Sequence, residues 1–292
     1  MAESRLSNYT APDGENLVML DWPQAQGRPP RGLVFIVHGL GEHAGRYEVL
    51  AERLNSWGFA VRAHDQYGHG ESDGERGALT SPTRLLDDLA DILDSTRRGM
   101  DPELPLILLG HSLGGLVAAR LVSLGLRPVD GLVLSSPAFD AGLNAWQRLM
   151  IAVLSRIAPN QRVRNGLDPK YLSHDDTVVR AYREDPLVHD RISARLARFI
   201  ADTGPAVLAQ APHWRVPTLL MYAGADRLVN PRGSRAFAAA APQQVVSAHC
   251  FSTHYHEIFN ERSREPVLLR LQRWLDTHFR DSTSPFPGSS WL

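Results

Sequence analysis

The 292-residue sequence predicts an α/β fold in which a doubly wound, mostly parallel sheet carries a helical insertion. Short apolar runs of strand length alternate with stretches in which apolar residues recur at helical spacing. This alternation is typical of parallel strands joined by helices. It stops between residues 138 and 213 and resumes after them. We therefore expect one core domain that is interrupted by an insertion.

Composition narrows the possible partners and location of the protein. The formal net charge of −1 gives no electrostatic reason to expect nucleic acid as a partner. Cys250 is the sole cysteine, which excludes a disulfide within the chain. Residues 1–10 lack the apolar core of a signal peptide, and no apolar run approaches the roughly 20 residues that span a bilayer. We expect a cytoplasmic protein, with the insertion as the surface for any transient membrane contact.

The predicted strands are short apolar runs bounded by turn residues. Residues 33–38 form a continuous apolar run next to glycines, as expected for a central strand that is buried on both faces. The predicted strands cover residues 17–22, 33–38, 59–64, 106–109, 132–136, 218–222 and 245–247.

The predicted core helices follow from boundary residues and apolar spacing. Gly58 suits the position after the end of one helix, and Ser81 with Pro82 suits the start of another. The predicted helices cover residues 47–57, 81–98, 113–124, an alanine-rich stretch around Ala236, and 267–279.

The insertion is predicted to be helical and without strands. The predicted domains are a core of residues 1–137 and 214–292 and a cap of residues 138–213, placed over the carboxyl ends of the strands. One apolar stripe at helical spacing comprises Leu143, Trp146, Met150, Val153 and Ile157. Ordinary contact with the core would explain most of this stripe. A cap that lies over the site could make this contact and cover the site at the same time.

The sequence Gly110-His111-Ser112-Leu113-Gly114 follows a predicted strand and precedes a predicted helix. Gly-x-Ser-x-Gly in this context is the nucleophile-elbow pattern, in which a strained turn holds the serine hydroxyl above the sheet. Both glycines are required because side chains at those positions would collide with the turn. Ser112 is therefore the candidate nucleophile.

A serine nucleophile needs a base within hydrogen-bond reach and an acid that orients the base, in the chain order serine, acid, histidine. Asp226 follows the strand at 218–222 directly and is the candidate acid, with Asp140 as the second choice. Chain order leaves four histidines as candidate bases: His249, His254, His256 and His278. His254 and His256 share the loop after the last strand, and their positions alone favour neither.

An acyl-transfer site also needs two backbone N–H donors for the oxyanion. Leu113 follows the nucleophile and supplies one, and Leu40 in the glycine-rich turn after residues 33–38 is the expected second donor. Several histidines lie on glycine-rich loops, but no accompanying ligand spacing indicates a metal site. We expect neither a metal nor a cofactor.

Six motifs resemble the monoacylglycerol lipase and lysophospholipase branch of the α/β-hydrolases. They are HGLGEHAGRY at 38–47, DQYGHGES at 65–72, GHSLGG at 110–115, YREDPLV at 182–188, ADRLV at 225–229 and YHEIFNE at 255–261. The resemblance implies Ser112, Asp226 and His256 as the catalytic triad. It also implies that Glu42 and Arg46 hold the oxyanion loop in shape as a charge pair.

The resemblance implies a serine hydrolase that cleaves monoacylglycerol to glycerol and fatty acid through an acyl-enzyme, with a lipid ester as its partner. A lysophospholipase or a broad carboxylesterase is the alternative. Most of the arginines of the cap, such as Arg148, Arg156, Arg162 and Arg164, are expected to form a solvated face, and the other interpretation is that they favour an anionic headgroup. A non-catalytic lipid-binding scaffold is the alternative from a different class. Acyl-chain preference and oligomeric state do not follow from the sequence.

Overall fold

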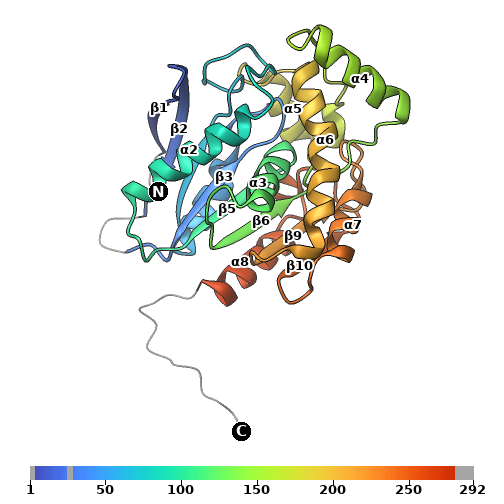
Figure 1. Cartoon of the computed structure of the whole chain (residues 1–292). Coiled ribbons are helices and arrows are strands. Elements are labelled where there is room, and N and C mark those ends of the chain that lie inside the picture. Colours follow the sequence, from blue (N-terminus) through green and yellow to red (C-terminus); the bar gives the residue numbers. More distant parts are fainter. Residues whose placement is uncertain (1–3, 25–28, 280–292) are drawn as a thin grey trace.

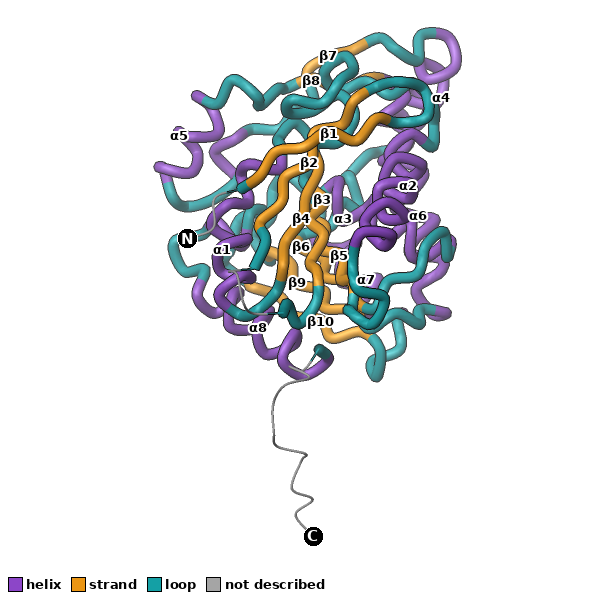
Figure 2. The backbone as a smooth tube through the Cα atoms, turned by 90° about the vertical axis from the view of Figure 1, so that its left-hand side faces the viewer, coloured by secondary structure: helices purple, strands orange, loops and turns teal. Residues whose placement is uncertain are grey.

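The computed structural model describes residues 4–24 and 29–279, and its centre is a twisted eight-stranded sheet (Figures 1 and 2). Its strands are β1 (Arg5–Thr10), β2 (Asn16–Trp22), β3 (Leu33–Val37), β4 (Ala60–His64), β5 (Leu106–His111), β6 (Gly131–Ser135), β9 (Thr218–Ala223) and β10 (Val246–Phe251). Their spatial order is β1-β2-β4-β3-β5-β6-β9-β10. Neighbouring strands are parallel from β4 to β10. At one edge of the sheet, β2 pairs antiparallel with both β1 and β4. The prediction of a mostly parallel sheet is therefore confirmed.

Helices cover both faces of the sheet and bury its apolar residues (Figures 1 and 2). Helices α1 (Glu48–Ser56) and α8 (Glu265–His278) pack on one face. The other face is covered by α2 (Arg84–Gly99), α3 (Leu113–Leu124), α6 (Ala194–Gln210) and α7 (Pro231–Ala240). Helix α2 begins three residues later than expected because residues 81–83 form a separate turn, in which the Arg84 N–H donates to the Ser81 carbonyl.

The strand order reverses between β3 and β5. From β3 the chain moves outward to β4, and β5 then lies on the opposite side of β3. The loops that follow two such strands diverge and leave a crevice at their carboxyl ends, where ligands bind in open α/β sheets. The loop of residues 38–43 and the turn at Ser112 therefore meet at this crevice.

Residues 138–213, the predicted cap, connect β6 to β9. They contain α4 (Ala145–Ile157), β7 (Arg162–Arg164), a 3-10 turn (Pro169–Tyr171), α5 (Asp176–Glu184), β8 (Arg191–Ser193), α6 and a 3-10 turn (Ala211–His213). The expectation that this region has no strands was wrong, because β7 and β8 pair antiparallel over three residues each. Each of these strands has a single apolar residue between two polar ones, which is too short a run to predict a strand. Helix α6 packs against α3 through Leu196, Phe199 and Val207. The division of the chain into a core domain and a cap stays a prediction.

Helix α4 corrects a second expectation. None of its residues is buried, and Trp146 and Ile157 are 67% and 73% exposed. The apolar stripe therefore does not serve as core contact. Figure 1 shows α4 at the upper edge of the molecule, distant from the sheet, with α6 beside it.

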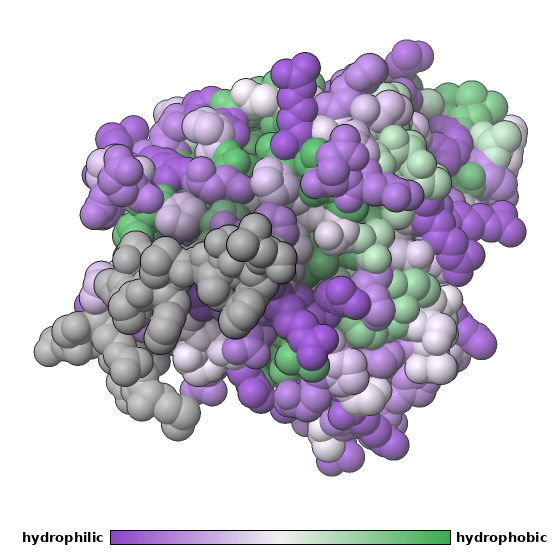
Figure 3. Space-filling view, turned by 90° about the horizontal axis from the view of Figure 1, so that it is seen from below, coloured by the Kyte–Doolittle hydropathy of each residue, from purple (hydrophilic) through white to green (hydrophobic). Residues whose placement is uncertain are grey.

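The end of the molecule opposite α4 does not share the exposed apolar face of that helix. In Figure 3, hydrophilic residues dominate that part of the face that uncertain residues do not cover, and hydrophobic residues occur in small groups. Cys250 on β10 is exposed. Within residues 4–24 and 29–279, the helices are too short or too polar to cross a membrane.

Candidate active site

Ser112 lies between β5 and α3 in the strained backbone that an elbow requires. Its φ of 52° and ψ of −117° belong to a region that costs a non-glycine residue roughly 1–3 kcal/mol. A Cβ on Gly114 would lie 2.0 Å from the Val37 carbonyl oxygen, and a Cβ on Gly110 would lie 2.5 Å from the Gly114 oxygen. Only glycine allows the elbow to approach β3 this closely.

Asp226 and His256 form a buried hydrogen-bonded pair beside the elbow. The Nδ1 atom of His256 lies 2.7 Å from Oδ2 of Asp226, and both side chains are at most 5% exposed. The other carboxylate oxygen, Oδ1, accepts the backbone N–H groups of Leu228 and Val229 at 2.9 and 3.0 Å. These bonds fix the carboxylate, and the His256 ring that it holds lines the same cavity as Ser112.

The pKa values of the pair are shifted in opposite directions. Burial raises the pKa of Asp226, but His256 and the two backbone donors lower it more, so that it lies below its usual value. Burial lowers the pKa of His256, but the Asp226 carboxylate raises it more, so that it lies above its usual value. The arrangement therefore favours an imidazole that accepts a proton readily.

The other candidate acid and bases form different contacts. Asp140 Oδ1 accepts the N–H of Gly142. The His254 ring lies 3.2 Å from the Ser263 carbonyl, and the His278 ring lies 2.9 Å from the Trp274 carbonyl. His249 is on β10 next to Arg270.

The loop after β3 approaches the elbow directly. A Cβ on Gly39 would lie 3.3 Å from the Cβ of Ser112, and Leu40 lines the same cavity as Ser112. The N–H of Leu40 donates to no acceptor within the described ranges. Leu113 is the first residue of α3, where an N–H has no partner within the helix. Both expected oxyanion donors are therefore free to bind a ligand.

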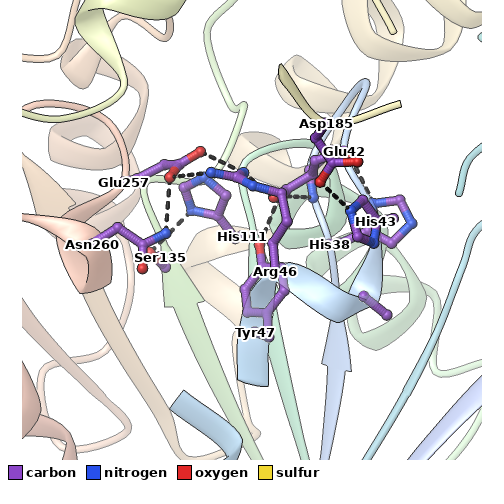
Figure 4. A network of polar contacts seen from close by, with 12 residues as sticks. His38, Glu42, His43, Arg46, Tyr47, His111, Ser135, Asp185, Glu257 and Asn260 are labelled. Carbon is purple, nitrogen blue, oxygen red and sulfur yellow. Dashed lines mark hydrogen bonds and ion pairs between the residues drawn. The ribbon is translucent and has the colours of Figure 1, made fainter. Parts of the chain in front are cut away.

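Arg46 is the centre of a buried polar network, which Figure 4 shows between Glu42 and Glu257. It donates to Glu42 Oε2 at 2.5 Å and to both oxygens of Glu257 at 2.7 and 2.8 Å. Glu42 Oε1 in turn accepts the Gly39 N–H at 2.6 Å and the Tyr47 hydroxyl at 2.7 Å. Burial raises the pKa of Glu42, but Arg46 and nearby histidines lower it to about 2, so the carboxylate stays charged.

This network extends the implied charge pair of Glu42 and Arg46. Because Glu257 follows His256, Arg46 connects the oxyanion loop to the histidine loop. A cation-π contact of 4.7 Å also places Arg46 against Tyr182 of α5. Glu257 and Tyr182 lie in the motifs quoted above. Their roles could not be predicted, because Arg46, which contacts both of them, is distant in the sequence.

The family model for Hydrolase_4, described as serine aminopeptidase S33, matches residues 28–263. The chain belongs to this family. A monoacylglycerol lipase from Mycolicibacterium smegmatis is 34% identical to this Hydrolase_4 chain over 252 residues, which are 85% of the chain and 89% of that protein. An abhydrolase domain-containing protein from Dictyostelium discoideum is 30% identical, and there the chain spans only 30% of the length of its relative.

A solved structure supports the same assignment. The monoacylglycerol lipase from Paleococcus ferrophilus has a TM-score of 0.78 and 35% identity to this Hydrolase_4 member, over 94% of this chain and 99% of that one. The predicted α/β-hydrolase fold and the resemblance to monoacylglycerol lipases are therefore confirmed.

The cavity at Ser112 is small in this member of the family. Its volume is about 20 Å³, which is room for about one water molecule. Leu167, Pro169 and Leu172 from the segment between β7 and α5 enclose it, together with Tyr182. No group of three or more His, Cys, Asp or Glu residues that could hold a metal ion occurs in the part of the chain that the structure describes.

Proposed function

We propose that this protein hydrolyses the ester bond of monoacylated lipids, and that monoacylglycerol is cleaved to glycerol and a fatty acid. The buried contact of 2.7 Å between Asp226 and His256, beside a serine at φ 52°, carries the proposal. The monoacylglycerol lipases among its relatives supply the substrate class. The Ser112, Asp226 and His256 side chains act as nucleophile, orienting acid and base.

The reaction proceeds in two steps at Ser112. The hydroxyl oxygen attacks the ester carbonyl while His256 takes the hydroxyl proton, and the backbone N–H groups of Leu40 and Leu113 stabilise the oxyanion. The carbonyl–oxygen bond to glycerol breaks, and His256 returns the proton to the leaving alcohol. Water that His256 deprotonates then attacks the acyl carbon, the bond from this carbon to Ser112 Oγ breaks, and His256 returns the proton to Ser112 as the fatty acid leaves.

Residues 138–213 act as a cap in this proposal. An acyl chain does not fit a cavity of about 20 Å³, so Leu167, Pro169 and Leu172 must separate from the elbow when substrate binds. The exposed apolar face of α4 provides the contact with a lipid surface from which a single-chain substrate is drawn.

Reaction with a fluorophosphonate probe and turnover of octanoylglycerol test the proposal together. We expect the wild type to be labelled and active, and Ser112→Ala to be neither. Ser123→Ala is the matched control, because Ser123 is in the same helix as the elbow and donates only to the Arg120 carbonyl. Labelling of Ser112→Ala would remove Ser112 from the nucleophile role. A wild type that binds octanoylglycerol without labelling or turnover would indicate a lipid-binding scaffold instead.

A further inference from the structure

A second cavity adjoins the one at Ser112 and is bordered by four arginines. Its volume is about 550 Å³, and it shares Leu167, Pro169 and Tyr182 with the cavity at Ser112. We call it the arginine cavity after Arg76, Arg162, Arg183 and Arg191, which line it. A volume in this range holds a small polar ligand or a lipid headgroup.

Four different segments of the chain each contribute one of these arginines. Arg76 comes from the loop between β4 and α2, and Arg183 comes from the last turn of α5. Arg162 and Arg191 come from β7 and β8, which pair side by side at the top of the molecule (Figure 2). Like charges that the fold brings together repel one another to the extent that neighbouring carboxylates or a bound anion do not offset them.

Among the residues that line the cavity, arginines outnumber carboxylates. Four guanidinium groups face two lining carboxylates, those of Asp185 and Asp190. Asp185 lies 2.8 Å from the His43 ring, and Asp190 already contacts both Arg164 and Arg191.

Among the arginines, Arg162 pairs with Glu75 at 3.0 Å, and Arg183 lies 4.0 Å from Asp168. Arg76 donates to the Ser72 carbonyl and contacts no carboxylate in the described residues. Burial and Arg76 lower the pKa of His189, which also lines the cavity, to about 4. This imidazole is therefore neutral at pH 7 and adds no charge to the cavity.

Two hydrogen bonds attach the β8 side of the arginine cavity to loops of the core. The N–H of His189 donates to the Gly41 carbonyl in the oxyanion loop at 2.9 Å, two residues before Arg191. The N–H of Ser193 donates to the Gly77 carbonyl at 2.8 Å, next to Arg76. These two bonds attach the residues just before β8 and the last residue of β8 to loops of the core. A ligand there would lie at a defined distance from an ester at Ser112.

We propose that the arginine cavity binds the phosphate of a phosphorylated headgroup, so that the enzyme also cleaves monoacylated glycerol phosphates. The proposal rests on ester hydrolysis at Ser112 and adds the class of leaving group. Guanidinium groups bind phosphate through paired charge-assisted hydrogen bonds, and the apolar residues at Leu167 and Tyr182 suit the glyceryl ester that joins the phosphate to the acyl chain.

Two substrates that differ only in the phosphate test this proposal. The hydrolysis of 1-octanoylglycerol and of 1-octanoylglycerol 3-phosphate is compared, since both chains are short enough to be used as monomers. We expect the wild type to have the lower KM for the phosphate ester. We expect Arg76→Gln to reduce the ratio of the two kcat/KM values about tenfold, which corresponds to about 1.4 kcal/mol.

A matched variant and a second cavity variant complete the test. Arg156→Gln removes the same charge from the exposed side of α4, outside the cavity lining, and should leave the ratio unchanged. Arg162→Gln should reduce the ratio as well, and it replaces Arg76→Gln if that variant does not fold. Equal loss on both substrates in the cavity variants, or a wild type that hydrolyses only the neutral ester, would overturn the proposal.

Two inhibition measurements distinguish a headgroup site from a site for free phosphate. Glycerol 3-phosphate should inhibit hydrolysis of the neutral ester competitively in the wild type and less strongly in Arg76→Gln. If sodium phosphate alone reproduces this inhibition while the phosphate ester is not preferred, the cavity binds free phosphate and the headgroup assignment is wrong. Absence of turnover of the neutral ester and of fluorophosphonate labelling would instead contradict the proposed function itself.

Discussion

Arg46 and Glu257 are 211 residues apart and form a bidentate ion pair of 2.7 and 2.8 Å that is buried beneath the cap. Arg46 follows the oxyanion loop, and Glu257 follows His256. The pair therefore joins the loop that carries the proposed oxyanion donor Leu40 to the loop that carries the proposed base His256. The same guanidinium also binds Glu42, so that one cation is shared by two buried carboxylates.

Arg46→Met should unfold the protein more easily and reduce its activity. Removal of one partner from a buried ion pair costs about 3–5 kcal/mol, since the remaining carboxylates stay charged without a partner. Urea unfolding followed by circular dichroism measures the loss. Arg53→Met is the control, because Arg53 pairs with Glu265 at 3.2 Å with both side chains largely exposed, and should cost less than about 1 kcal/mol. Equal losses of unfolding free energy in the two variants would show that the buried network contributes no more to stability than an exposed ion pair.

Gly114→Ala should abolish labelling of Ser112 by a fluorophosphonate. The added Cβ would lie 2.0 Å from the Val37 oxygen and 2.4 Å from the His38 oxygen, so either the elbow or β3 must move. Gly99→Ala at the end of α2 meets nothing within 4 Å and should preserve labelling, with a stability gain of up to about 1 kcal/mol. Normal labelling of Gly114→Ala would contradict the close packing of elbow and strand.

Local sequence patterns were sufficient to predict most of the core. The strand that ends before Gly39 and the strand that ends before Ser112 are both continuous apolar runs, and parallel strands of this kind have few alternative arrangements. The candidate acid was found because its strand ends directly before it. Each of these inferences depends on residues that are close in sequence.

The features that were missed depend on contacts between distant residues. The pairing of Arg46 with Glu257 has no signature in either loop alone. Strand β1 lacks an apolar face and is held by its backbone pairing with β2, so its residues carry no periodic signal. The stripe on α4 has the period of a buried helix, and period alone does not distinguish a core partner from solvent or lipid.

Trp146→Ser combined with Ile157→Ser should weaken binding to phosphatidylcholine vesicles. The apolar residues of α4 recur at positions 146, 149, 150, 153, 154 and 157, which form one exposed face. The loss of two large apolar side chains from a lipid contact of this kind should reduce the partition coefficient by at least about tenfold. Vesicle co-sedimentation measures it. Val49→Ser on α1 removes an exposed apolar residue from the other side and should have no effect. Unchanged binding of the double variant would exclude α4 as the lipid contact.

Asp226→Asn tests the orienting carboxylate through both rate and pH dependence. In the wild type, Asp226 holds the pKa of His256 above its usual value of roughly 6.5, so kcat/KM should fall as the pH decreases through a value above 6.5. The amide keeps the burial that lowers the pKa of His256 and removes the charge that raises it. The acid limb should therefore move to lower pH, and the rate at pH 8 should fall by about 10⁴-fold.

The stability of the same variant should change with pH in a defined direction. The raised pKa of His256 stabilises the wild type below pH of roughly 6.5, and this contribution is lost as the pH rises through the value in the folded state. The lowered pKa of Asp226 stabilises it above pH of roughly 4, and this contribution is lost as the pH falls through the value in the folded state. The difference in unfolding free energy between wild type and Asp226→Asn should therefore be largest between these limits, near pH 5 to 6. Urea titrations at pH 3, 5.5 and 9 measure it, and a difference that is constant across them would mean that the pair is not ionised in the folded protein.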